Sequence, residues 1–269
     1  MSWRLGISTG ACTQRPILEV LPAIRAAGAH GVEVGTPPRH FDPWNDAQVR
    51  ELDRGLRASG LEAISIHAPF GGPLDLADAN PHHRHAGIGA ALTAALALKR
   101  LGGRLVIVHP SDLLRHEHDV HARLQDAARS LALLAENCTQ AALQLVVESP
   151  LPHLIGGHPD EFAFLLKDLP ASVGVCLDTG HTFLGRHWGQ FIAVAGARLT
   201  HVHANDNRGT RDDHLPPGDG LIDWPDVARS LREAKFTGWI MLELACPDPQ
   251  GLDGHLRGAY ERTCELLAP

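Results

Sequence analysis

The chain has 269 residues, of which 44% are hydrophobic and 20% are charged, so it can form a substantial folded core. Its net charge of −7, from 24 basic and 31 acidic residues, argues against a protein that mainly grips nucleic-acid phosphates. No apolar run approaches the ~20 residues of a membrane span, and the first residues do not resemble a secretion signal. Five cysteines without a CxxC pair favour a reduced, cytoplasmic protein.

Short aliphatic runs alternate with longer amphipathic segments along the whole chain. The runs that predict strands are 5–8, 31–34, 63–67, 105–109, 143–148, 172–178, 199–203 and 239–244. The segments that predict helices are 16–28, 46–60, 85–101, 120–141, 161–169, 188–195, 224–234 and 252–267. Eight strand–helix units predict an α/β fold, a single (β/α)8 TIM barrel domain over residues 1–269. An open doubly wound sheet is disfavoured, because the loop at 9–14 contains one glycine and no glycine-rich phosphate motif.

Ionisable residues stand at the ends of six predicted strands. They are His67, His109, Glu148, Asp178, His203 and Glu243. All strands of a parallel barrel end at one mouth, where TIM-barrel active sites are built. Side chains alternate between the faces of a strand, so Val146 shares a face with Glu148 and Cys176 shares one with Asp178. We therefore expect the six side chains to converge on one rim.

Three carboxylates on one rim would repel each other by several kcal/mol per pair at an effective dielectric of ~20. A bound cation removes that cost, and carboxylates together with neutral imidazoles are typical ligands of divalent transition metals. A lone strand-end histidine is more often a hydrogen-bonded rim residue, so the prediction depends on the whole set. Two loops, after the sixth and seventh strands, add His181, Asp212 and His214. The nine predicted metal ligands are His67, His109, Glu148, Asp178, His181, His203, Asp212, His214 and Glu243.

The motifs that contain these residues resemble those of the xylose isomerase-like TIM barrel superfamily. The matching motifs are His67-Ala68-Pro69, Val108-His109-Pro110, Glu148-Ser149, Asp178-Thr179-Gly180-His181, His203-Ala204-Asn205-Asp206-Asn207 and the segment 212–220. That superfamily includes sugar phosphate isomerases and epimerases and the endonuclease IV branch, AP endonuclease family 2. The isomerase branch implies one metal held by Glu148, Asp178, His203 and Glu243. The endonuclease branch implies three zinc ions that use all nine residues.

Composition favours a small-molecule substrate, because the chain is acidic, has only three lysines and is 5% aromatic. We expect an isomerase or epimerase of a sugar or sugar phosphate that depends on one to three divalent ions (Zn, Mn, Mg or Fe). Glu148 and Glu243 are expected to transfer the proton through a metal-stabilised ene-diolate. His181, Arg208 and Trp44 are expected to contact the substrate, with Phe41 as an alternative to Trp44. Glu33 is expected to orient a metal ligand or to form a plain salt bridge, and His201 to pack one layer below His203.

Two alternatives stay open at this point. One is an endonuclease IV-like trinuclear zinc phosphodiesterase that acts on abasic DNA. The other is a barrel that only stores or senses metal, which would lack a substrate pocket beside the ligands. Barrel helices pack equally well alone or against a second copy, so the sequence is compatible with a homo-oligomer.

Overall fold

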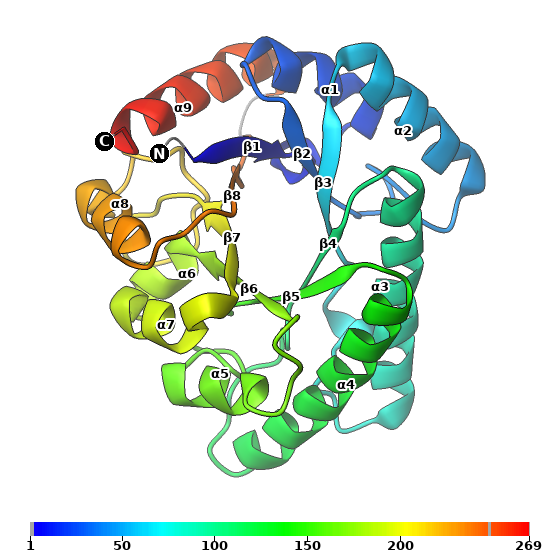
Figure 1. Ribbon diagram of the computed structural model, residues 1–269, viewed down its shortest axis with the longest axis vertical. Coiled ribbons are helices and arrows are strands. Elements are labelled where there is room, and N and C mark those ends of the chain that lie inside the picture. The colour runs from blue at the N-terminus through cyan, green and yellow to red at the C-terminus, as the bar shows by residue number, and fades with distance from the viewer. Residues whose placement is uncertain (1–2, 247–248, 269) are drawn as a thin grey trace.

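The computed structural model describes residues 3–246 and 249–268. Eight parallel strands close one barrel in chain order, and β1 pairs with both β2 and β8. Figure 1 looks down this barrel, with the helices around it as an outer ring. This confirms the predicted (β/α)8 fold. The strands are β1 Arg4–Ser8, β2 Gly31–Val34, β3 Glu62–His67, β4 Leu105–Val108, β5 Gln144–Glu148, β6 Gly174–Asp178, β7 Leu199–Ala204 and β8 Trp239–Leu242.

The helices match the predicted order, with one addition, and two of them, α3 and α5, start earlier than predicted. They are α1 Ile17–Ala26, α2 Asp46–Ser59, α3 Pro81–Arg100, α4 Val120–Gln140, α5 Pro159–Leu166, α6 Thr179–Leu184, α7 Trp188–Ala195, α8 Trp224–Glu233 and α9 Leu252–Leu266. Helix α3 begins four residues before the predicted position 85. The Asn80 side chain accepts the N–H of His82 at 3.0 Å, and Pro81 fits the first turn, where no N–H partner is needed.

The residues after β6 form the helix α6, where the sequence predicted a loop. The Asp178 carboxylate accepts the backbone N–H of His181 at 2.7 Å and so caps the helix. His181 therefore lies on the first turn of a helix, directly above the end of β6. This correction matters for the site, because a helix holds the imidazole more rigidly than a loop.

The hydrophobic core has two parts, which are separated by the wall of the barrel. The larger part lies between the strands and the helices. The smaller part contains Ile107, Val146 and Cys176 inside the barrel, as the predicted alternation along β5 and β6 requires. Phe41 belongs to the larger part and is 0% exposed, so the expectation that it stacks on a sugar is wrong.

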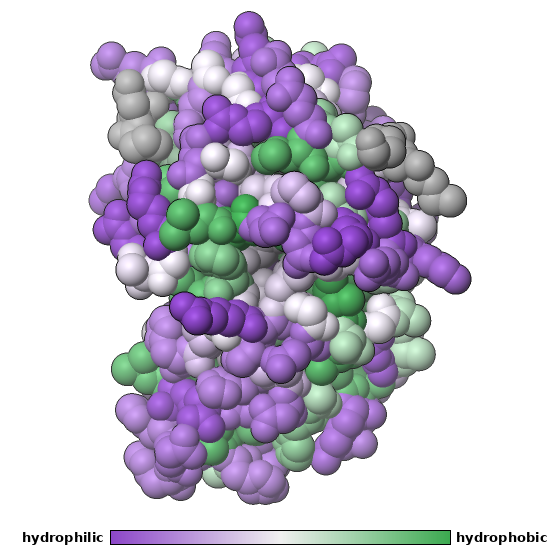
Figure 2. All heavy atoms as spheres, turned by 90° about the vertical axis from the view of Figure 1, so that its left-hand side faces the viewer, coloured by the Kyte–Doolittle hydropathy of each residue, from purple (hydrophilic) through white to green (hydrophobic). Residues whose placement is uncertain are grey.

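The face on the left of Figure 1, which carries α8, is mostly hydrophilic in Figure 2. Hydrophobic residues on this face form small separate groups and no continuous patch among the described residues. Within the described residues, none of the helices combines the length and hydrophobicity needed to cross a bilayer.

Candidate metal centre

All nine predicted ligands lie at the carboxyl-terminal mouth of the barrel, in three groups, two of which share Glu148. Within each group, one nitrogen or oxygen atom of every residue lies within 4.8 Å of the others. The groups are His67–His109–Glu148, His181–Asp212–His214 and Glu148–Asp178–His203–Glu243. A fourth group, Glu33–His201–His203, lies two residues deeper along β7. The spacing of each group fits a metal ion, because donor atoms around one ion are close neighbours.

Glu148 joins two of the groups through its two oxygens. Its Oε2 lies 3.2 Å from Nε2 of His67 and 3.3 Å from Nε2 of His109. Its Oε1 lies 3.2 Å from Nδ1 of His203, which is also 3.1 Å from Oε2 of Glu243. The carboxylate is 1% exposed, and it stands at the last residue of β5. Each oxygen is therefore available to a different ion.

Backbone carbonyls fix the orientation of three histidines. Nδ1 lies 3.1 Å from the Ala68 carbonyl in His67, 2.9 Å from the Ser149 carbonyl in His181 and 3.0 Å from the Glu243 carbonyl in His214. A carbonyl oxygen only accepts, so Nδ1 must donate in each case. The remaining nitrogen, Nε2, faces the carboxylates of the groups. Each ring is therefore oriented as a metal ligand that binds through Nε2.

His203 has the opposite orientation, and a buried carboxylate sets it. Its Nε2 lies 3.1 Å from Oε1 and 3.2 Å from Oε2 of Glu33, so Nδ1 faces Glu148 and Glu243. Glu33 also accepts the Ser65 hydroxyl at 2.8 Å and lies 3.3 Å from Nε2 of His201. Glu33, His201 and His203 are all 0% exposed. The structure thus places Glu33 behind His203, in the position expected for an orienting group, and His201 one layer deeper.

Asp178 is held on both sides by hydrogen bonds. One oxygen caps α6, and the other accepts the Asn205 side-chain amide at 2.7 Å. Asn205 can approach this closely because residue 180 is glycine, and a Cβ there would collide with the Asn205 side chain. The Asp-Thr-Gly-His motif therefore has a structural cause: aspartate caps the helix, glycine admits Asn205 and histidine enters the site.

The carboxylates of the site keep neighbouring imidazole rings protonated and so positively charged. Burial disfavours the charged form of His67, but the hydrogen bond and charge of Glu148 outweigh it and raise the pKa of His67 to about 9. Burial acts in the same way on His214, yet Asp212 and Glu243 raise its pKa to about 10. Burial raises the pKa of Asp178 to about 6, although His181 opposes this. The metal-free site therefore compensates its carboxylates with protonated imidazoles.

Several buried atoms of the site lack a hydrogen-bond partner within the described residues. They include Oε1 of Glu148, Nδ1 of His203 and Oδ1 of Asp212. Glu148 Oε1 and His203 Nδ1 are close to each other but do not have hydrogen-bond geometry. Unpaired buried polar atoms cost about 1–3 kcal/mol each, and coordination to a metal ion removes that cost. The mixed imidazole and carboxylate set fits a divalent transition metal.

Two connected cavities open onto these groups. A cavity of about 190 Å³ is lined by residues of all three groups, including Glu148, His181 and Glu243. A cavity of about 710 Å³ lies beside it and shares His67, Phe70, His214 and Glu243 with it. Trp44 lines the larger cavity, as expected for a substrate contact. Arg208 is exposed and lines neither cavity, and its backbone N–H donates to Asp213 at 3.1 Å.

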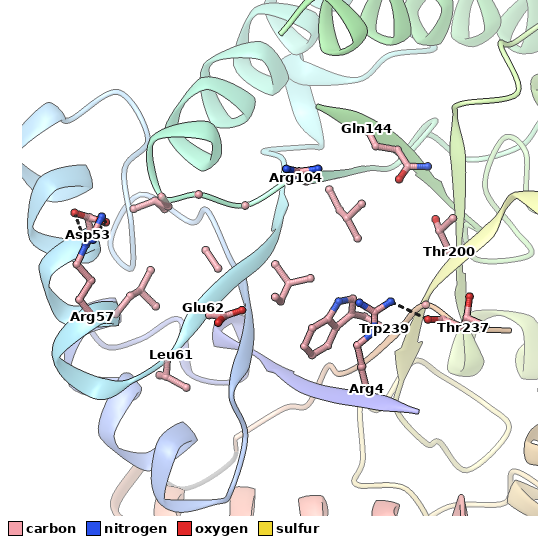
Figure 3. A pocket seen from close by; sticks show the side chains of 18 of the residues that line it. Arg4, Asp53, Arg57, Leu61, Glu62, Arg104, Gln144, Thr200, Thr237 and Trp239 are labelled. Atoms are coloured by element: carbon pink, nitrogen blue, oxygen red, sulfur yellow. Dashed lines mark hydrogen bonds and ion pairs between the residues drawn. The ribbon is translucent and has the colours of Figure 1, made fainter. Parts of the chain in front are cut away.

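Another large cavity, of about 610 Å³, lies at the amino-terminal mouth of the barrel (Figure 3). Trp239, Arg104 and Gln144 line it from the starts of β8, β4 and β5. Arg57 pairs with Asp53 at 3.0 Å on α2, and Arg4 donates to the Thr237 carbonyl at 2.8 Å. None of the metal-ligand groups found among the described residues involves this mouth.

The sequence analysis missed two residues that shape the site. Phe70 packs on the rings of His109 and His67, with centroids 4.2 and 5.0 Å apart, and it lines both cavities. The sequence signal that could have identified Phe70 is its position directly after the motif His67-Ala68-Pro69. Asn205 belongs to the motif that begins at His203, but its hydrogen bond to Asp178 depends on packing between α6 and β7.

Comparison with known proteins places the chain in a family. An uncharacterized protein of Methanocaldococcus jannaschii is 27% identical over 188 residues, which cover 67% of this chain and slightly less than two thirds (64%) of that protein. A probable endonuclease 4 of Campylobacter hominis is 23% identical over 205 residues, which cover 67% of this chain and 70% of that protein. The crystal structure of a D-tagatose 3-epimerase-like protein has the same fold, with a TM-score of 0.82, 22% identity and coverage of 98% of this chain and 100% of that chain. Residues 21–268 match the profile of the xylose isomerase-like TIM barrel, and the chain belongs to that family.

Proposed function

We propose that the chain is a divalent-metal-dependent isomerase or epimerase of a sugar. The observation that carries this proposal is the convergence of Glu148 and Glu243 on one atom, Nδ1 of His203, at 3.2 and 3.1 Å. The two carboxylates come from β5 and β8, so they reach the site from different sides. An epimerase needs this arrangement, since one group must remove a proton from a carbon and another must return it.

Glu148, Asp178, His203 and Glu243 are the residues proposed to hold the metal. A divalent ion supplies Lewis acidity there, which makes a C–H beside a carbonyl acidic enough for a carboxylate to remove. Glu148 takes the proton from the carbon between the carbonyl and hydroxyl groups, and Glu243 delivers one to the resulting ene-diolate. Asp178 and His203 stay fixed during the reaction, because Asn205 and Glu33 hold them.

Proton exchange with solvent tests this function directly. The protein loaded with Mn²⁺, Co²⁺ or Zn²⁺ is incubated in D2O with a panel of ketoses and oxo-sugars, and deuterium in the recovered sugar is measured by mass spectrometry. We expect metal-dependent incorporation of one deuterium at the carbon beside the carbonyl. Glu243→Gln should lower the rate about 10²–10⁴-fold while the melting temperature changes little. Equal exchange with and without metal would refute the proposal.

A trinuclear zinc phosphodiesterase is the second candidate, and one observation favours it. The groups His67–His109–Glu148 and His181–Asp212–His214 exceed what a single ion needs. Zinc-loaded protein and a duplex with one abasic site at low salt provide the test, because phosphate contacts are strongest there. Cleavage that His109→Ala and His214→Ala both abolish would support this function. Absence of both binding and cleavage would exclude it.

A further inference from the structure

The cavities beside the metal-binding groups, of 710 Å³ and 190 Å³, have no arginine or lysine side chain among their described lining residues. The smaller one adds Asp112 and Asp212 to the acidic side chains there. Phosphate groups are usually held by arginine, lysine or the backbone N–H groups of a helix start. The described lining offers a phosphate none of these partners, so the cavities fit an uncharged substrate better.

The larger cavity is mostly apolar away from the metal-binding groups. Trp44 and Phe70 face it and are 54% and 49% exposed. Two of its hydroxyl side chains are engaged within the protein: the Thr36 hydroxyl donates to the His67 carbonyl at 2.8 Å, and the Ser8 hydroxyl accepts the Gly10 N–H at 3.3 Å. Sugar hydroxyls placed there would lose hydrogen bonds to water and gain few in return. An apolar group would instead cover exposed aromatic surface.

The size of the larger cavity also points beyond a free monosaccharide. Pockets of roughly 300–1,000 Å³ hold drug-sized ligands, and this one has 710 Å³ in addition to the 190 Å³ at the metal-binding groups. We propose that the substrate is an uncharged oxo-glycoside whose sugar ring lies at the metal-binding groups and whose apolar aglycone lies against Trp44 and Phe70. This inference rests on the proposed isomerase function and names its substrate class.

The reaction chemistry sets where the carbonyl lies. A glycosidic bond converts the anomeric carbonyl into an acetal, so the carbonyl that activates the C–H must be an oxo group on another ring carbon. Glu148 then breaks the C–H bond beside it, the electron pair forms the ene-diolate, and Glu243 returns a proton to the opposite face. The step is an isomerisation, and it needs no oxidant or reductant.

Three matched probes test the proposal: 3-oxo-β-D-glucose and its methyl and phenyl glycosides. Deuterium incorporation from D2O gives kcat and KM, and calorimetry gives the binding of unoxidised methyl and phenyl β-D-glucosides. We expect the phenyl probes to exceed the methyl probes by about 10- to 100-fold in kcat/KM and in affinity, since burying an aromatic ring contributes that much. Trp44→Ala should remove this advantage through KM, and Trp44→Phe should retain most of it. Leu96→Ala on α3, where Leu96 is 57% exposed and outside both cavities, is the control and should change nothing.

The outcomes separate this inference from the proposed function. Exchange that is equally fast for the free sugar and its phenyl glycoside would overturn the inference and leave the isomerase function intact. Tighter, Trp44-dependent binding of phenyl glucoside without any exchange would support the apolar subsite and count against the isomerase. A phenyl preference that survives Trp44→Ala would also overturn the inference, because the proposed contact would then contribute nothing.

Discussion

The two mouths of the barrel hold cavities of similar size but differ in how their ionisable side chains are satisfied. At the amino-terminal mouth, with its 610 Å³ cavity, charged groups are partnered or exposed: Arg57 pairs with Asp53, while Glu62 is exposed. At the carboxyl-terminal mouth, Glu148 and His203 are buried, yet each has an atom without a hydrogen-bond partner in the described structure. Buried ionisable side chains with unpaired atoms therefore distinguish the carboxyl-terminal mouth better than cavity volume does, since the unpaired atom at the other mouth is the neutral Thr200 hydroxyl.

The difference between the two mouths can be followed along a single strand, β5, whose first and last residues lie at opposite mouths. Gln144, at its start, lines the amino-terminal cavity, and its side chain donates to the Ser172 carbonyl at 2.9 Å. Glu148, at its end, faces the histidines of two metal-binding groups. The two ends of β5 therefore provide a test position in the site, Glu148, and a matched control position, Gln144.

The largest effect is expected from Glu148→Gln. The amide keeps the volume but loses the negative charge that faces four imidazoles, so metal should be lost and deuterium exchange should fall about 10³-fold or more. Metal content by elemental analysis and the exchange rate are the measurements. Gln144→Ala should leave both unchanged, with a comparable melting temperature. Full metal content and activity in Glu148→Gln would remove the distinction between the two mouths.

A smaller effect is expected from Glu33→Gln. Glu33 contacts His203 but lines neither cavity of the site, so the change should weaken metal binding about 10- to 100-fold without removing a ligand. The loss of charge should also shift the His203 ring towards the other tautomer, which ¹⁵N NMR of the imidazole reports. Glu62→Gln, an exposed carboxylate at the start of β3, is the matched control. An unchanged tautomer and affinity would assign Glu33 a packing role only.

Metal binding should also depend on pH at the carboxyl-terminal mouth. The pKa of His67 is about 9 and that of His214 about 10, so both rings are protonated at pH 7 in the metal-free protein. An ion that binds their Nε2 must displace a proton, so affinity should rise up to about 10-fold per pH unit for each proton released and level off above pH ~10. Titration calorimetry in two buffers of different ionisation enthalpy counts the protons. Binding that is independent of pH between 6 and 9 would show that these histidines are not ligands.

The residues that the sequence placed correctly are those whose position follows from local periodicity. Glu148, Asp178 and His203 stand at or near the ends of aliphatic runs, so alternation along each strand and the closure of a parallel barrel bring them together. His181 was placed near the site but in a loop, since its helix depends on the Asp178 cap. The six ligands at strand ends were therefore predictable from local periodicity, whereas His181, Asp212 and His214 were predicted from their place in the loops that follow two of those strands.

Features that depend on contacts between distant segments were not accessible. Phe41 and Trp44 are three residues apart in one loop, yet Phe41 is buried in the core and Trp44 is 54% exposed in the cavity wall. Arg208 is exposed and lines neither cavity, although it follows a site motif. The Nδ1 contacts of His67, His181 and His214 go to backbone carbonyls, which no side-chain pattern reveals. Tertiary packing determines the burial of Phe41 and Trp44, the position of Arg208 and the orientation of the histidine rings.

The smallest functional effect is expected at the amino-terminal mouth, from Trp239→Ala. The indole packs against Gly31, where a Cβ would collide with it, and Arg4 lies over the ring at 5.2 Å. The ring is only partly buried, so its loss should cost about 2 kcal/mol, below the ~3–5 of a core tryptophan. This lowers the melting temperature by about 4–8 °C, whereas metal affinity and the exchange rate should stay within twofold. A large loss of metal affinity would mean that the two mouths are energetically coupled, because strands β8 and β1, which carry Trp239 and Arg4, would then transmit packing changes along the barrel to Glu243.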